Sequence, residues 1–417
     1  MLLQNVFYDG QVCDILIQGN KIARIAPHII IPNEETLDCS GKAILPSFAN
    51  THTHASMMFL RGVGEDKPLF EWLNESIWPL EAKLKPEHIY PLSRFAILEM
   101  IKTGTTFFCD MYCDVDETVK AVQDMGIRAM IPYVGAMDVF DSNEFPKRLT
   151  KATNYMSTSS PCSRIIKGLS CHAIYTTSEK MIRTFYEMAR EQDTYFHIHI
   201  SETRKEVEDC MKEHGMSPVE YLDSLGILGP DVIAAHTLWL SDNDVRILGE
   251  RGVTCVHNIN SNLKLASGYR FRYNELRAAG ANVCLGTDGC GSSNNLDILE
   301  AMKTSAIVQK AWRDDPSAMP LDELAAMVST NAAKALGINA GQIKEGMLAD
   351  ILIIDTDNYQ FLSPAGFLAN LVYSAHSDCV DSVICDGKFI MRGRVVEGEK
   401  EIIDNAREQM YRVWIQE

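Results

Sequence analysis

Short apolar runs alternate with segments of helical periodicity along most of the chain, from about residue 45 onward. The apolar run in TGTTFFCDMY precedes a helical pattern in DETVKAVQDMG, and a second apolar run follows in IRAMIPYVGA. Asp116 before this helical pattern and Gly126 after it are ordinary helix start and stop signals. Such alternation predicts βαβ units that build a parallel sheet.

Eight strand-like runs can be counted in this region. They are AILPSFANTHTH, TTFFCDM, RAMIPYVGA, RIIKGLSCHA, TYFHIHI, DVIAAHTLW, VTCVHNI and ANVCLGTD. Eight alternating units predict an α/β fold of the (β/α)8 TIM-barrel type, which uses about 250 residues and carries its active site at the carboxyl ends of its strands. We expect this barrel to comprise residues 49–336.

Both ends of the chain have a different pattern, in which short β-rich runs are separated by turns. Residues 1–45 predict a small antiparallel sheet with a hairpin turn at Gly19 and Asn20. Similar runs return in MLADILIID and SVICDGKFIMRGRVVEG. The 417 residues exceed what one barrel needs. We therefore expect residues 1–48 and 337–417 to pair into one small β-sandwich domain beside the barrel.

Composition narrows the functional classes. The 39 basic and 56 acidic residues give a net charge of −17, which opposes binding to nucleic acid or to anionic membranes. The partner that we expect is a small-molecule substrate. The 12 cysteines are scattered through apolar segments, as expected of reduced thiols. Neither a charged-then-apolar leader nor an apolar run of about 18 residues is present, so we expect a cytoplasmic protein.

Candidate metal ligands follow the strand-like runs. His52 and His54 stand two residues apart at the end of the first barrel strand, so their imidazoles project from one face and can bind one Zn, Fe or Ni ion. Later runs end with further candidates, namely His197, His199, Glu202, His236 and Asp288. Each alone has a structural explanation as a core histidine, a helix cap or a turn residue. Because the carboxyl ends of barrel strands lie at one face, these candidates other than His197 can converge.

The longer motifs around these residues resemble the amidohydrolase superfamily. Within it they are similar to the mononuclear S-adenosylhomocysteine/5′-methylthioadenosine deaminases and their chlorohydrolase and atrazine-type relatives. The motifs are FANTHTHASMMFLRG, FEWLNESIWPLEAKL, HIHISETRKEV, HNINSNLKLASG and LGTDGCGSSNNLDILEAM. The resemblance extends over nearly the whole chain and implies a metal-dependent aminohydrolase acting on C–N bonds of cyclic amidines.

The resemblance also implies a ligand set for one divalent metal per chain, with zinc preferred to iron: His52, His54, His199 and Asp288. His199 is preferred to His197 because the family's ligand stands three residues before the catalytic glutamate, here Glu202. His197 would then lie one step deeper in the barrel. Binuclear relatives use a carboxylated lysine, but Lys167 lies five residues before His172, too deep for that role.

The implied chemistry is hydrolytic deamination. A bound cation lowers the pKa of its water from ~15.7 toward ~7 and so supplies hydroxide at neutral pH. Asp288 would accept a proton from that water, and His236 would hold the hydroxide. Glu202 would carry protons to a ring nitrogen and then to the leaving group, work that is typically worth ~10²–10⁴-fold in rate. The products would be an oxo-heterocycle and ammonia.

Substrate contacts are also implied by position, at Trp72, Glu81, Arg148, His172 and Glu202. Glu81 would bind the ribose hydroxyls, although a salt bridge on a helix surface is the alternative. Arg148 would bind a homocysteine carboxylate, but one residue fewer than expected separates it from His172. His172 would lie near the purine or the ribose, and Trp72 against the sugar or its 5′ substituent.

Three functions remain open at this point. The first is deamination of a purine nucleoside such as S-adenosylhomocysteine, 5′-methylthioadenosine or adenosine. The second is hydrolysis of another heterocycle, such as guanine, an oxidised purine, a pterin or a chloro- or amino-triazine. The departures SCHAIYT and HNINSN, where the family has GPHAPYT and HNPxSN, alter expected pocket loops and leave this choice open. The third is a non-catalytic metal-binding protein. Barrels of this family often form homo-oligomers, and the sequence does not fix the oligomeric state.

Overall fold

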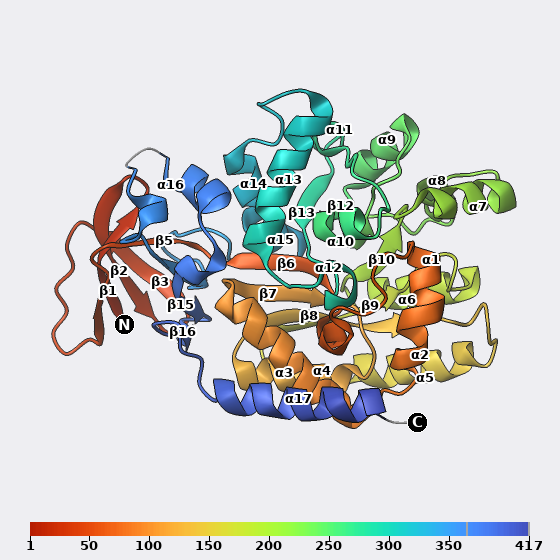
Figure 1. The fold of residues 1–417 in the computed structure, drawn as a ribbon, viewed down its shortest axis with the longest axis horizontal. Coiled ribbons are helices and arrows are strands. Elements are labelled where there is room, and N and C mark those ends of the chain that lie inside the picture. The colour runs from red at the N-terminus through yellow and green to blue at the C-terminus, as the bar shows by residue number, and fades with distance from the viewer. Residues whose placement is uncertain (364–365, 416–417) are drawn as a thin grey trace.

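A computed structural model describes residues 1–363 and 366–415 of the chain (Figure 1). One of its sheets contains eight strands that pair in parallel, in the order β13-β12-β11-β10-β9-β8-β7-β6. The strands are β6 (Phe48–Thr53), β7 (Thr105–Asp110), β8 (Arg128–Gly135), β9 (Ile165–Cys171), β10 (Phe196–Ile200), β11 (Val232–His236), β12 (Thr254–His257) and β13 (Asn282–Leu285). Each of the eight predicted runs supplies one strand to this sheet, and the predicted (β/α)8 fold is confirmed.

Helices surround this sheet (Figure 1). They are α3 (Pro86–Lys102), α4 (Val115–Met125), α5 (Glu144–Ser157), α6 (Glu179–Glu191), α7 (Arg204–His214), α8 (Pro218–Ser224), α9 (Asp242–Arg251), α10 (Ile259–Lys264), α11 (Tyr273–Ala278), α12 (Cys290–Ser293), α13 (Ile298–Arg313), α14 (Leu321–Met327) and α15 (Thr330–Ala335). Helix α6 is representative: the Ser178 side chain caps its first turn, and it buries Met181, Ile182 and Phe185. The strands are buried on both faces, which explains their nearly continuous apolar runs.

The first and last barrel strands are joined at their carboxyl ends. The Asp288 amide donates to the His52 carbonyl at 3.0 Å. The Thr287 amide donates to Asn50 Oδ1 at 3.0 Å, and Asn50 Nδ2 donates to Thr287 Oγ1 at 2.7 Å. These bonds bring the H-x-H motif beside the T-D-G motif, although the two are more than 230 residues apart in the sequence.

The two termini share a second, mixed sheet of eight strands, in the order β16-β15-β14-β5-β1-β2-β3, with β4 paired to β1. These strands are β1 (Leu2–Tyr8), β2 (Gln11–Gln18), β3 (Lys21–Ala26), β4 (Thr36–Asp38), β5 (Lys42–Pro46), β14 (Ile351–Asp355), β15 (Val380–Cys385) and β16 (Lys388–Met391). The antiparallel pair β5–β14 joins the two ends of the chain, as predicted, and the hairpin turn lies at Gly19 and Asn20.

Two details of this sheet differ from the sequence predictions. The N-terminal part is not purely antiparallel, because β1 runs parallel to both β4 and β5. The apolar run AILPSFANTHTH is also not one strand: β5 pairs with β14 in the mixed sheet, whereas β6 pairs with β7 in the barrel. Buried residues occur in both halves of the run, Ala43 and Ile44 in β5 and all six residues of β6, so the sequence pattern alone does not reveal the division.

The C-terminal helix α17 (Glu399–Ile415) returns to the barrel and lies along α3 (Figure 1). Arg94 on α3 pairs with Glu401 at 2.9 Å, and Trp414 Nε1 donates to the Phe59 carbonyl at 3.1 Å. A buried ion pair at 3.1 Å between Arg128 on β8 and Asp350 before β14 also links the barrel to the mixed sheet. The domain boundaries, 49–336 for the barrel and 1–48 with 337–417 for the β domain, stay a prediction.

Short helical segments complete the described chain. They are η1 (Ala55–Leu60), α1 (Leu69–Trp72), η2 (Leu73–Ile77), α2 (Trp78–Glu81), η3 (Tyr359–Phe361), α16 (Phe367–Ala369), η4 (Asn370–Ser374) and η5 (Ser377–Cys379). Among the described residues, no helix is both long enough and apolar enough to span a membrane. All 12 cysteines lie in the described part of the chain and are unpaired.

Candidate metal and active site

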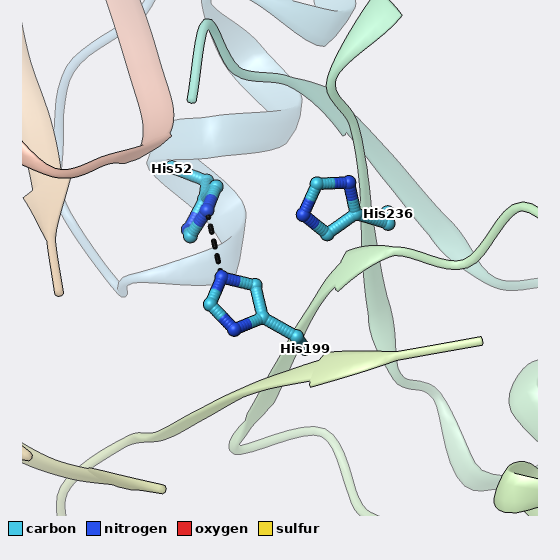
Figure 2. A group of neighbouring side chains, drawn as sticks. All are labelled: His52, His199 and His236. Carbon is cyan, nitrogen blue, oxygen red and sulfur yellow. Dashed lines mark hydrogen bonds between the residues drawn. The ribbon is translucent and has the colours of Figure 1, made fainter. Parts of the chain in front are cut away.

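The four implied metal ligands meet at the carboxyl ends of the barrel strands. His52 Nε2 lies 3.2 Å from His199 Nε2 (Figure 2). Asp288 Oδ1 lies 3.1 Å from His54 Nε2 and 3.5 Å from His52 Nε2. Ligand atoms of a tetrahedral zinc site with bonds of about 2.0–2.1 Å are about 3.3–3.4 Å apart. The observed separations therefore match the distances between ligand atoms in such a site.

Hydrogen bonds on the far side of the imidazoles orient them toward this centre. His199 Nδ1 lies 2.8 Å from the His172 carbonyl, and His54 Nδ1 contacts the Met111 carbonyl. Since a carbonyl only accepts, both Nδ1 atoms carry a proton, and each Nε2 points to the centre, where it can bind a metal ion once it is deprotonated. His52 Nδ1 lies 3.1 Å from Nε2 of the deeper His197. The ring of His197 thus supports a ligand and does not face the centre itself.

The Asp288 carboxylate is held in the same way. Its Oδ2 accepts hydrogen bonds from Ser261 Oγ at 2.6 Å and from Ser292 Oγ at 2.8 Å, so Oδ1 faces the histidines. Burial alone would raise the pKa of Asp288, but hydrogen bonds to His52 and His54 outweigh it and hold that pKa well below its usual range. The backbone of Asp288 is left-handed, with φ of 63°, a conformation that aspartate tolerates better than most non-glycine residues.

This donor set fits a divalent metal ion. Imidazoles, which bind in their neutral form, and ionised carboxylates are typical ligands of such a cation. His236 lies close as well, because its ligand atom and those of His52 and His199 fall within 4.8 Å of one another (Figure 2). Lys167 does not reach the centre, since its Nζ donates to the carbonyls of Tyr155 at 2.7 Å and Thr158 at 2.9 Å. The structure therefore places the amino group of Lys167 away from the ligand cluster.

Glu202 and His236 stand beside the ligands. Their closest atoms, Glu202 Oε2 and His236 Nε2, are 3.8 Å apart. Burial, and secondarily the charge of Asp288, raise the pKa of Glu202 to about 8. His236 Nδ1 lies 2.9 Å from Asn262 Oδ1, which leaves Nε2 facing the cavity as an acceptor. Glu202 can therefore hold a proton at neutral pH next to a histidine that can accept a hydrogen bond.

A cavity of about 420 Å³ opens above the ligands. Its wall includes nine of the ten predicted site residues: His54, Trp72, Glu81, Arg148, His172, His199, Glu202, His236 and Asp288. The tenth, His52, is completely buried beneath them. Residues 69–81, from α1 through η2 to α2, supply apolar side chains to the wall. The segment after the first barrel strand thus consists largely of short helices that contribute to the cavity.

The four predicted substrate contacts that are not catalytic all face this cavity. Glu81 accepts a hydrogen bond from the Tyr112 hydroxyl at 2.6 Å, and burial raises its pKa. It is therefore not the exposed salt bridge that was the alternative. Arg148 pairs with Glu144 at 3.1 Å and also donates to the Val134 carbonyl at 3.4 Å.

The other two predicted contacts, His172 and Trp72, also line the cavity. His172 Nδ1 lies 2.8 Å from Thr176 Oγ1, and its ring centroid is 5.0 Å from that of His199. Burial lowers the pKa of His172 to about 3, so the ring is neutral. Trp72 donates from Nε1 to the Val63 carbonyl at 3.1 Å, which fixes its indole in the wall.

Several supporting residues were not predicted from the sequence: Tyr112, Ser261, Asn262 and Ser292. Tyr112 contacts Glu81, and Asn262 contacts His236. Ser261 and Ser292 both contact Asp288. All four follow a barrel strand by a few residues, after β7, β12 or β13. That position, combined with a hydroxyl or amide group, is the signal that could have identified them.

Comparisons with known proteins agree with this architecture. The model of the amidohydrolase family matches residues 43–390. The 5′-deoxyadenosine deaminase of Methanothermobacter thermautotrophicus is 40% identical over 393 residues, which cover 94% of this chain and 91% of the relative. The 5-methylthioadenosine/S-adenosylhomocysteine deaminase of Thermococcus sibiricus is 43% identical over 382 residues, which cover 91% and 89%.

Solved structures of related enzymes have the same fold as this chain. An adenosine deaminase from Xanthomonas campestris with bound zinc superposes with a TM-score of 0.91 at 29% identity, over 97% of this chain and 94% of the other. Atrazine chlorohydrolase from Arthrobacter aurescens, complexed with zinc, has a TM-score of 0.89 over 98% and 99%, but its 21% identity supports only the shared fold. The family match covers most of the sequence, including every strand of the barrel, and the chain therefore belongs to the amidohydrolase family.

Proposed function

We propose that this protein is a metal-dependent hydrolase that deaminates the adenine ring of a nucleoside. The observation that carries the proposal is the placement of Glu202, His236 and Asp288 around one ligand cluster at the base of a single cavity. The names of the two relatives described above and of the adenosine deaminase structure support the same reaction class. Candidate substrates are 5′-deoxyadenosine, 5′-methylthioadenosine, S-adenosylhomocysteine and adenosine.

Zinc is the metal that we propose for the site formed by His52, His54, His199 and Asp288. The ligand spacing fits zinc, and the adenosine deaminase at 29% identity carries it. When bound, a divalent cation lowers the pKa of a coordinated water and supplies a nucleophile at neutral pH. The protein residues then have to orient the ring, exclude bulk water and move protons.

Proton transfer is the role that we propose for Glu202. Since its pKa is raised to about 8, it is protonated at neutral pH and can donate to a ring nitrogen of the substrate. The resulting carboxylate can then take up a proton and pass it to the departing amino group. Asp288, whose pKa is held low, stays ionised and can accept a proton near the attacked carbon, while His236 Nε2 can accept a hydrogen bond there.

Recognition of the sugar is the role that we propose for Glu81 and its neighbours. The Glu81 carboxylate faces the cavity and is oriented by Tyr112, so its second oxygen can accept hydrogen bonds from a ribose diol. Trp72 can pack against the sugar or its 5′ substituent, and His172 lies beside His199, close to where the ring would bind. Arg148 can bind an anionic 5′ tail, but it must share its guanidinium with Glu144.

The test is a substrate panel on zinc-loaded protein, with ammonia release and the change in ring absorbance as readouts. The panel contains the four adenine nucleosides above, guanine, a pterin, and a chloro- and an amino-triazine. We expect turnover of at least one 5′-substituted adenosine and the loss of most of it in Glu202→Gln. Turnover of a pterin or triazine with none on adenosine derivatives would replace the proposed substrate class. Release of ammonia from no compound would leave a non-catalytic metal-binding protein.

A further inference from the structure

The buried carboxylate of Glu206 holds the backbone of the turn that carries Glu202. Glu206 is the third residue of α7 and is 3% exposed. Its Oε1 accepts a hydrogen bond from the Ser201 amide at 2.9 Å, and its Oε2 accepts one from the Glu202 amide at 2.7 Å. Both carboxylate oxygens are therefore used on two successive peptide groups, one of which belongs to Glu202.

This arrangement differs from an ordinary helix cap. In a capping box, the carboxylate at the third helical position returns to the amide of the N-cap residue. Glu220 and Asp244 do so for Ser217 and Ser241 in α8 and α9 of this chain. Glu206 has the same position relative to its N-cap, Thr203, whose hydroxyl accepts from the Glu206 amide at 3.1 Å. Its carboxylate nevertheless reaches one and two residues farther back.

The turn also needs support, because Ser201 has a left-handed backbone with φ of 53°. Such a conformation costs on the order of 1–3 kcal/mol and persists only where its surroundings enforce it. The Ser201 carbonyl accepts from the amides of Leu238 at 3.1 Å and Trp239 at 2.9 Å. Those residues belong to the loop directly after His236. The turn is thus fixed by Glu206 on one side and by the His236 loop on the other.

We infer that Glu206 is a positioning residue that holds the Glu202 carboxyl group in register with His236 and the metal ligands. The inference rests on the proposed function, in which Glu202 carries the proton. It follows from the contacts, since the amide of Glu202 is bound by Glu206 and the preceding carbonyl is bound by the loop of His236. A misplacement of about 1 Å in a reacting group can reduce turnover about 10²-fold.

The Glu206→Gln variant tests this inference. Its side-chain amide would place N–H groups opposite one of the two backbone donors, so one of the two hydrogen bonds is lost. We expect kcat to fall roughly 10- to 100-fold, whereas KM stays within about threefold and one metal per chain is retained. Glu220→Gln removes a capping carboxylate at the same helical position in α8, far from the cavity wall, and should leave kcat unchanged.

A double-mutant cycle separates positioning from other roles. In a Glu202→Gln background, Glu206→Gln should reduce the residual kcat by less than about threefold, because its effect passes through Glu202. A full additional 10-fold loss in that background, or an unchanged kcat in the single variant, would overturn the inference. If Glu206→Gln yields no folded protein, Glu206→Asp decides the matter: its shorter carboxylate cannot span both amides, so a wild-type kcat would overturn the inference equally.

The proposed function is tested separately, by the activity of the wild type and of the Glu202→Gln variant. Inactive wild-type protein, or a fully active Glu202→Gln variant, would refute the deaminase mechanism itself. An active wild type with an inactive Glu202→Gln variant, combined with a wild-type kcat in Glu206→Gln, would refute only the positioning role.

Discussion

Replacing Glu202 by Gln should make the protein more stable while it removes most turnover. The pKa of this buried carboxyl group rises from an ordinary value of 4.5 to about 8 in the folded chain. Ionisation therefore favours the unfolded state, by about 3 kcal/mol at pH 7 and about 5 kcal/mol above pH 9, at about 1.36 kcal/mol per tenfold change in proton affinity. Gln has nearly the same shape and does not ionise, so the variant avoids this loss.

The sign of the pH dependence follows from the raised pKa. Stability from protonated Glu202 is fully present below about pH 4.5 and is lost as the pH rises through about 8. The difference in unfolding free energy between variant and wild type should thus be near zero at pH 4.5 and should grow up to about pH 8 to 9. A bound cation favours the ionised carboxylate, so the full difference is expected only after the metal is removed.

Urea unfolding of metal-stripped wild type and variant at several pH values measures this difference. Glu208→Gln, an exposed change on α7, is the matched control and should shift stability by less than about 0.5 kcal/mol. Turnover of the metal-loaded Glu202→Gln variant should fall by about 10²–10⁴-fold. A variant that is less stable than wild type at pH 8, or a gain that does not vary with pH, would refute the assignment of a protonated, buried Glu202.

Three further predictions concern other residues. Arg128→Ala should destabilise the protein by about 3–5 kcal/mol in urea unfolding, because it leaves the buried Asp350 carboxylate without its partner; a loss below about 1 kcal/mol would contradict this. Glu81→Ala should reduce kcat/KM for a ribonucleoside by an amount equivalent to about 1.5–3 kcal/mol, and much less for the 2′,3′-dideoxy analogue; equal losses would show that Glu81 does not bind the diol. Arg148→Ala should impair S-adenosylhomocysteine more than 5′-methylthioadenosine, since only the former has an α-carboxylate; an equal effect on both in steady-state kinetics would exclude that contact.

The sequence predicted those features that depend on local pattern. Buried parallel strands are continuous apolar runs, so all eight barrel strands could be located. Their polar ends gave a wider list of candidates, and the choice of His52, His54, His199 and Asp288 as the ligand set came from the family resemblance. The division between β5 and β6 could not be predicted, because it is defined by pairing with β14 and β7 rather than by hydrophobicity.

Contacts that depend on closure of the barrel could not be predicted from the sequence pattern either. Ser261 and Asn262 reach Asp288 and His236 across 27 and 26 residues, and nothing in their own segment indicates those partners. The partners of the Glu206 carboxylate could not be predicted from its local sequence either. Its T-x-x-E pattern is typical of a capping box, whereas the structure directs its carboxylate to the turn before the helix.

Restoration of activity by zinc tests the central claim most directly. Protein stripped of metal by a chelator is titrated with zinc, and deamination of 5′-deoxyadenosine is measured at each step together with metal content. The account predicts that activity rises linearly and reaches its plateau at one zinc per chain, and that a His52→Ala/His54→Ala variant recovers neither metal nor activity. Full activity in the stripped protein, or a plateau reached only at two zinc ions per chain, would contradict a single-metal aminohydrolase.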